Sequence, residues 1–70
     1  MARADTVRSA RWRVQVYSPL GEVTHESSFR SLEAAESYYG TLAIARSVKR
    51  LAVRPAGAAR FELIRREVMS

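Results

Sequence analysis

The stretch from Ser31 to about Ala45 constrains the fold most, because it alone has the spacing of an amphipathic helix. Ser31 can cap the helix N-terminus through its hydroxyl, while Glu33 and Glu36 place negative charge in the first turns, where the helix dipole favours it. Every other apolar segment has the pattern of a strand, so we expect this helix to cover a sheet. Its apolar stripe consists of Leu32, Ala35, Tyr39, Leu42 and Ala43.

Four segments around the helix show the two-residue alternation of half-buried strands. Residues 11–17 and 22–29 flank the sequence Ser-Pro-Leu-Gly, in which Pro and Gly favour a turn, and together they predict a β-hairpin. Residues 47–54 and 60–68 flank the small-residue loop 55–59 and predict two further strands. The predicted order of elements is therefore ββαββ.

This order predicts a single α+β domain over residues 11–68, preceded by a flexible N-terminal arm over residues 1–10. A right-handed crossover through the helix gives a four-stranded antiparallel sheet of order 2-1-3-4, with one helix packed on one face. The other face would then be open to solvent, as antiparallel sheets tolerate. The predicted core is Trp12, Val14, Val16, Val23, Phe29, Leu32, Ala35, Tyr39, Leu42, Leu51, Val53, Phe61 and Leu63.

Length and composition exclude several classes of protein. Seventy residues leave room for one core, and the chain has no Cys for a disulfide or a thiolate metal site. The first residues lack the apolar core of a signal peptide, and no apolar run approaches membrane-spanning length. We expect a soluble cytoplasmic protein that has no membrane partner and no cofactor.

The formal net charge of +5 is unevenly distributed along the chain. Basic and acidic residues balance up to Ala45, and the whole excess comes after it, where seven basic residues face two acidic ones. Such asymmetry favours an anionic partner, such as nucleic acid or an acidic protein surface. The alternative is coding bias, because eleven of the twelve basic residues are Arg, which is typical of a GC-rich genome.

The open face of the predicted sheet would be rich in arginine, and this is the main functional signal in the sequence. Guanidinium groups match phosphate geometry, so we predict electrostatic nucleic-acid binding with little sequence specificity. One aromatic side chain on this face could stack on a base. The alternative is an ordinary solvated face, on which the arginines pair across strands with acidic residues. The predicted nucleic-acid-binding residues are Arg13, Tyr17, Arg50, Arg54 and Arg66.

A protein–protein interface is the second functional hypothesis. A small domain with a bare sheet can bury it by forming a homodimer or by binding a host protein, through the open face or through the edge of the last strand. Ile64 and Val68 are apolar positions on the solvent side of that strand. Ile44 falls off the helix stripe, so either the helix ends before it or it forms an exposed apolar contact. These three residues are the predicted interface residues.

No residue pattern supports catalysis or metal binding. His25 is the only histidine, and it lies at a core-facing strand position without a second ligand at suitable spacing, so we expect a packed or edge-lying imidazole. The serines lack a base poised for activation, and we predict that the protein is not an enzyme. Arg3 and Arg8 of the N-terminal arm offer a minor-groove contact as a further alternative to a disordered arm.

Two segments carry a resemblance to a known group of proteins. The sequence Trp-Arg-Val-Gln-Val-Tyr-Ser-Pro-Leu-Gly at 12–21, followed by Phe-Arg-Ser-Leu-Glu-Ala-Ala-Glu at 29–36, resembles short accessory proteins encoded by phages of GC-rich actinobacteria. The resemblance consists of strand, turn and helix-start patterns. It implies a small, non-essential binding protein directed at the host or at a genome, and it assigns no functional residue.

Overall fold

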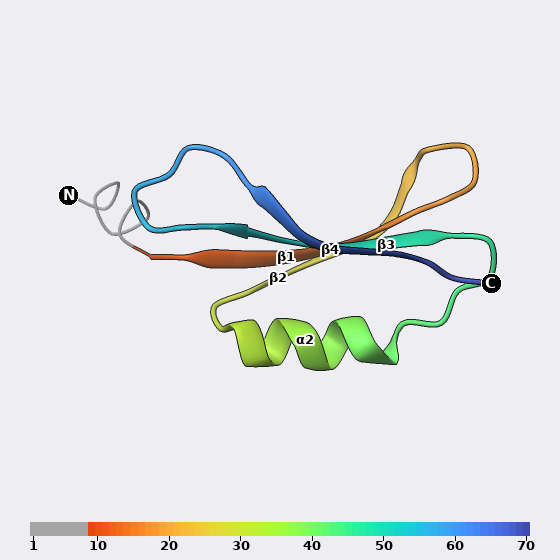
Figure 1. Ribbon diagram of the computed structural model, residues 1–70, viewed down its shortest axis with the longest axis horizontal. Coiled ribbons are helices and arrows are strands. Elements are labelled where there is room, and N and C mark those ends of the chain that lie inside the picture. Colours follow the sequence, from red (N-terminus) through yellow and green to blue (C-terminus); the bar gives the residue numbers. More distant parts are fainter. Residues whose placement is uncertain (1–8) are drawn as a thin grey trace.

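A computed structural model describes residues 9–70 of the chain. The elements follow in the order β1 (Arg11–Tyr17), β2 (Val23–Phe29), α2 (Leu32–Thr41), β3 (Val48–Arg54) and β4 (Glu62–Val68). The four strands form one sheet of order β2-β1-β3-β4, and every neighbouring pair is antiparallel. Figure 1 shows α2 lying along one face of this sheet. The predicted ββαββ fold is confirmed. The predicted arm at residues 1–10 lies almost entirely outside the described residues.

Helix α2 begins as predicted but is shorter at its C-terminal end. The Ser31 hydroxyl accepts a hydrogen bond from the backbone N–H of Ala34 at 3.1 Å, which completes the N-cap. The helix ends at Thr41, and Leu42 already has extended backbone angles. Two carbonyl oxygens at the end of the helix accept hydrogen bonds from the sheet, because the Lys49 ammonium group donates to those of Tyr39 and Leu42 at 2.8 and 3.3 Å. Ile44 therefore lies in the connection to β3.

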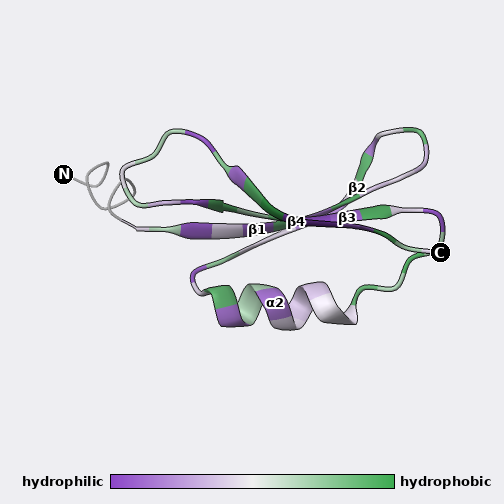
Figure 2. Ribbon diagram, in the orientation of Figure 1, coloured by the Kyte–Doolittle hydropathy of each residue, from purple (hydrophilic) through white to green (hydrophobic). Residues whose placement is uncertain are grey.

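The core lies between α2 and the central strands β1 and β3. Val14 and Leu51 face each other across these strands and pack with Ala35 and Tyr39 of the helix, and all four are at most 1% exposed. Trp12, Phe29, Tyr38 and Leu42 are partly buried against this cluster. In Figure 2 the helix begins with strongly hydrophobic and hydrophilic bands and becomes nearly neutral toward its end. The predicted core is confirmed at its centre.

The periphery of the predicted core is wrong at the hairpin end of β2. The pairing register between β1 and β2 shifts between Val16 and Tyr17, so that Val23 pairs with Tyr17 in place of Thr24. Val23 is consequently 45% exposed. His25 sits opposite Val16 on the edge strand and is exposed, so its imidazole is at the edge and unpacked. Leu32, in the first turn of α2, is 40% exposed.

The same correction applies to β4, where a second register shift separates Leu51 from Ala52 on the partner strand. A β-bulge adds one residue to a strand and so exchanges the faces of the side chains beyond it. Leu63, predicted as core, pairs with Ala52 and is 50% exposed. Glu62 pairs with Val53, whose alternation with Leu51 puts it on the helix side, although the sequence pattern predicts Glu62 on the open side.

The two hairpin connections rise on the side of the sheet away from α2 (Figure 1). The β1–β2 connection is a tight turn that is closed by backbone hydrogen bonds between Ser18 and Glu22 and between Gly21 and Ser18, with Gly21 at a φ of +86°. The sheet face opposite the helix is therefore flanked at both ends by raised chain. Within residues 9–70, no helix has the length and apolar character needed to cross a membrane.

Candidate nucleic-acid interface

The sheet face away from α2, called the open face below, carries a row of side chains from β1, β3 and β4. On β1 the buried Val14 and Val16 point to the helix, so the alternate residues of the strand lie on the open face. The pairing registers extend this assignment to the neighbouring strands. The open face comprises Arg11, Arg13, Gln15, Tyr17, Val48, Arg50, Ala52, Arg54, Leu63, Arg66 and Val68.

Arginines on the open face are placed directly opposite one another. Arg50 of β3 pairs with Arg66 of β4, and Arg11 of β1 pairs with Arg54 of β3. Like charges at directly opposed positions destabilise a sheet. Among the described residues, the open face holds one ion pair within 4.0 Å, between the Arg13 Nε and a carboxylate oxygen of Glu26. The opposed arginines thus concentrate positive charge without neutralising partners from residues 9–70.

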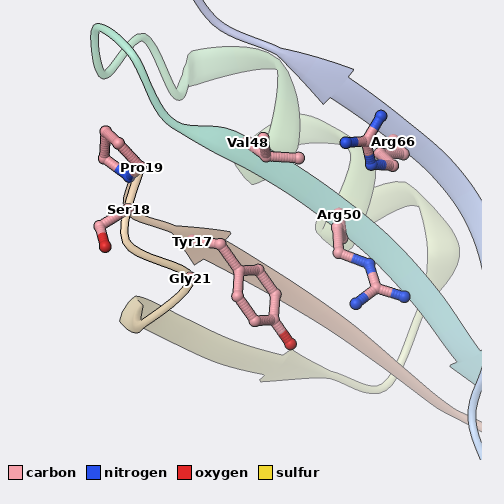
Figure 3. Close-up of a pocket in the computed structure, with 7 residues that line it drawn as sticks. All are labelled: Tyr17, Ser18, Pro19, Gly21, Val48, Arg50 and Arg66. Atoms are coloured by element: carbon pink, nitrogen blue, oxygen red, sulfur yellow. The ribbon is translucent and has the colours of Figure 1, made fainter.

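A hollow of about 330 Å³ lies at the end of the open face that is next to the β1–β2 turn. Tyr17, Val48, Arg50 and Arg66 line its floor and one side, and the turn contributes Ser18, Pro19 and Gly21. In Figure 3 the Arg50 side chain extends from β3 between Tyr17 on β1 and Arg66 on β4. The Arg50 guanidinium carbon is 5.4 Å from the centre of the Tyr17 ring, within the range of a cation–π contact.

A second aromatic group gathers arginines toward the other end of the open face. Phe61 precedes β4, and its ring centre is 3.9 Å from the Arg13 guanidinium carbon and 5.7 Å from that of Arg54. These contacts place Phe61 on the open face, whereas the sequence pattern predicts it in the core. The Nε of Arg13 is buried and has no hydrogen-bond partner within residues 9–70. Phe61 and Glu26 together hold Arg13 close to the sheet.

The five predicted nucleic-acid-binding residues fall into two groups on this face. Tyr17, Arg50 and Arg66 meet at the hollow, while Arg13 and Arg54 meet at Phe61. Sequence reasoning missed Phe61 because the bulge in β4 reverses the faces that simple alternation predicts. A signal was present nevertheless. Alternation that keeps Phe61 and Leu63 in the core also puts Arg65 and Glu67 there, and this inconsistency indicates an irregular strand.

Basic side chains on the helix side of the sheet have partners within the protein. Lys49 is 8% exposed, and in addition to its two helix carbonyls its ammonium group lies 3.9 Å from Glu67. Arg65 forms an ion pair with the same carboxylate at 3.4 Å, and its guanidinium carbon is 4.8 Å from the Tyr39 ring centre. Burial, and then the nearby Glu67 carboxylate, raise the pKa of Tyr39 above 10.0. This cluster has a structural role.

The three predicted interface residues lie on two segments of the chain and differ in exposure. Val68 is 66% exposed and pairs with Val48 on the open face, and Ile64 is 44% exposed at the bulge of β4. Ile44 is half-buried, and its backbone N–H donates to the sulfur of Met69 at 3.3 Å. Ile44 therefore holds the connection after α2 against the C-terminal segment.

The remaining properties of the chain are its capacity for metal binding and its similarity to known proteins. Within the described part of the chain, no group of three or more His, Cys, Asp or Glu side chains is arranged to hold a metal ion. The His25 Nδ1 lies 3.0 Å from the Thr24 hydroxyl, its neighbour on the edge strand. Comparison of the chain with protein-family models, with curated proteins and with solved structures finds no match.

Proposed function

We propose that the protein is a small, non-enzymatic module that binds nucleic acid electrostatically through its open face. The single observation that carries this proposal is the pair of directly opposed arginines, Arg50 with Arg66, beside Tyr17 in the hollow. Guanidinium groups on two directly paired residues can both donate to one phosphate group, and binding a phosphate would relieve their mutual repulsion.

The distribution of charge between the two faces supports the same partner. Lys49 and Arg65 on the helix side share the Glu67 carboxylate, whereas the open face holds Arg11, Arg13, Arg50, Arg54 and Arg66 with Glu26 near one of them. Within residues 9–70, the unpartnered positive charge is therefore concentrated on one face of the sheet, as expected for a surface that binds a polyanion. Recognition through phosphates alone carries no sequence information, so we expect weak sequence preference.

The test is a fluorescence-anisotropy titration of labelled DNA and RNA at low and at physiological salt. We expect the affinity to fall steeply with salt, because bound arginines release counterions from the phosphates. The variant that reverses both Arg50 and Arg66 to Glu should bind at least tenfold more weakly and show a shallower dependence on salt.

A matched control separates the site from the overall charge. Arg30→Glu combined with Arg46→Glu gives the same change of formal net charge, from +5 to +1, because each reversal removes two charges. Both control residues are exposed and lie in the connections to α2, outside the hollow. We expect the control to keep most of the affinity. Equal losses in the two double variants would contradict a defined site, as would unchanged binding by the Arg50/Arg66 variant.

A protein-interaction or homodimerisation module is the second candidate. The observation that favours it is the edge strand β4, whose seven residues are all exposed and include Leu63, Ile64 and Val68 at 50%, 44% and 66% exposure. An edge strand with apolar side chains can add to another sheet. This candidate predicts a concentration-dependent mass above 7.9 kDa, or a defined complex with one host protein, and Ile64→Glu should abolish either. Phosphate binding should barely respond to that change.

A further inference from the structure

The geometry points to the hollow as a subsite for one unpaired nucleotide, with the base against Tyr17 and the phosphate between Arg50 and Arg66, so that the open face selects single strands over duplexes. This inference rests on the proposed nucleic-acid binding and adds the class of nucleic acid and the position of one nucleotide. It follows from the shape, the aromatic wall and the charge of the hollow.

The size of the hollow sets what can enter it. At about 330 Å³ it lies near the lower end of the range found for small-ligand pockets, roughly 300–1,000 Å³. A volume of this size accommodates a group such as a single nucleotide. The raised β1–β2 turn bounds the hollow on one side, as Figure 3 shows for Pro19 and Ser18.

Tyr17 supplies a wall on which a base can stack. Its hydroxyl donates to the Gln15 side-chain oxygen at 3.2 Å, and this bond fixes the orientation of the ring. A base inside a duplex is stacked on its neighbours and does not offer a free face, whereas an unpaired base can leave the stack and lie on an aromatic side chain. The aromatic wall therefore favours single strands.

Arg50 and Arg66 supply the charge next to that wall. The Arg50 guanidinium carbon is 5.4 Å from the centre of the Tyr17 ring, and Arg50 is paired with Arg66, which also lines the hollow. A base stacked on Tyr17 would carry its own phosphate to these donors.

Polar groups that could read a base edge are scarce in the hollow. The Ser18 hydroxyl already accepts hydrogen bonds from the backbone N–H groups of Leu20 and Glu22, at 3.2 and 3.3 Å, and so serves the turn. Val48 and Pro19 contribute apolar surface. Stacking without base-edge contacts tolerates every base. We therefore infer binding with little base preference.

A strand fits the open face better than a free mononucleotide does. Arg13 and Arg54 gather at Phe61 toward the opposite end of the face. Arg13 and Tyr17 are four positions apart on β1, which corresponds to roughly 13 Å along the strand. A chain of several nucleotides can reach both groups of arginines, whereas a single nucleotide reaches only one. Additional phosphate contacts raise the affinity in the way expected for a polyanion.

The test compares a fluorescein-labelled 12-nucleotide oligothymidylate with a labelled 12-base-pair dA·dT duplex at the same salt concentration. We expect the single strand to bind at least tenfold more tightly than the duplex. Tyr17→Leu should lower the affinity for the single strand about tenfold, since it keeps apolar bulk and removes the ring. Tyr17→Phe keeps the ring and should stay within about threefold of the wild type. Duplex binding should change little in either variant.

Failure of this inference is distinguishable from failure of the proposed function. Equal affinities for single strand and duplex, with no effect of Tyr17→Leu but a large effect of the Arg50/Arg66 reversal, would overturn the nucleotide subsite and leave nucleic-acid binding intact. No binding to either probe at low salt would overturn both. Thymidine monophosphate that binds as tightly as the oligothymidylate would overturn the extended strand in favour of a free-nucleotide pocket.

A residue-resolved readout guards against a variant that fails to fold. In ¹H–¹⁵N spectra of the wild-type protein, we expect the oligothymidylate to shift the backbone amides of Gly21 and Val48, which line the hollow. Shifts confined to residues around Phe61 would overturn the subsite. The dispersed spectrum of each Tyr17 variant, compared with that of the wild type, verifies its fold.

Discussion

Basic side chains have acidic or carbonyl partners on one face of this sheet and lie opposite one another on the other face. On the helix side, Lys49 donates to two carbonyl oxygens at the end of α2 and shares the Glu67 carboxylate with Arg65. On the open face, Arg50 is directly opposite Arg66, and Arg11 is directly opposite Arg54. The same strand, β3, contributes Lys49 to the first arrangement and Arg50 to the second.

This difference separates structural charge from charge that is available to a partner. Cations that have partners contribute hydrogen bonds and hold α2 against the sheet. Arginines that lie directly opposite each other repel, and so they destabilise the strand pair that carries them. Net charge alone does not make this distinction, since Lys49 and Arg65 belong to the same basic last third of the sequence as Arg50 and Arg66. The arrangement of partners is therefore more informative than the count of charges.

The largest expected effect is a loss of stability when the helix-side cation is removed. Lys49→Met removes the charged donor from the carbonyl oxygens of Tyr39 and Leu42 in a nearly buried site, and the Tyr39 carbonyl keeps the bond from the backbone N–H of Leu42 at 3.3 Å. We expect the free energy of unfolding to fall by about 3 kcal/mol. Arg50→Met on the same strand is the matched control, and it should change the stability by no more than about 0.5 kcal/mol. Urea unfolding measures the stability of both variants. Similar losses of stability in the two would contradict the distinction between the two faces of the sheet.

A smaller loss is expected at Arg65, where the ion pair is half-exposed. Arg65→Glu removes the contact with Glu67 at 3.4 Å and the contact with the Tyr39 ring at 4.8 Å, and it puts two carboxylates on one strand face. We expect a destabilisation of roughly 1 kcal/mol, which is reduced by screening at high salt. Urea unfolding at two salt concentrations measures this effect, and unchanged stability at low salt would show that the helix-side pair contributes nothing.

The smallest effect concerns alkaline pH and Tyr39. Burial, and then the Glu67 carboxylate, raise the pKa of this phenol above 10.0, so the folded state holds the proton more tightly than the unfolded state does. The resulting stability is complete below the unfolded pKa and is lost as the pH rises through the raised one. Wild-type stability should therefore fall more steeply than that of Tyr39→Phe between about pH 9 and pH 11. Urea unfolding at a series of pH values measures this difference. The same pH dependence of stability in the wild type and in Tyr39→Phe would contradict a raised pKa for Tyr39.

Sequence patterns predicted the element order, the sheet order and the centre of the core, because these depend on periodicity and chain direction. Val14, Leu51, Ala35 and Tyr39 occupy the positions expected from alternation and from the helix stripe. The end of α2 was predicted too late along the chain. The Lys49 ammonium group donates to the Tyr39 carbonyl oxygen at the end of the helix, and local sequence does not reveal this contact because Lys49 lies on β3.

The edges of the site were predicted wrongly because two register shifts decide them. Val23, Phe61 and Leu63 were assigned to the core by alternation, and the bulges move each of them out of it. Neither shift is marked by glycine or proline within its strand. Arg13, Tyr17, Arg50 and Arg54 were nevertheless assigned to the open face, since β1 and β3 pair with each other without a shift. Arg66 was assigned there as well, because it lies on the C-terminal side of the irregularity in β4 and pairs with Arg50.

The most direct test of the account is one variant with two readouts. Arg66→Glu places a negative charge opposite Arg50, so it should raise the unfolding free energy by roughly 0.5 kcal/mol while it lowers oligothymidylate affinity at least tenfold. A gain of stability together with a loss of affinity is the result expected if the opposed arginines serve to bind an anionic partner. If stability and affinity fell together, or if binding were unchanged, the opposed arginines of the open face would not be a binding site.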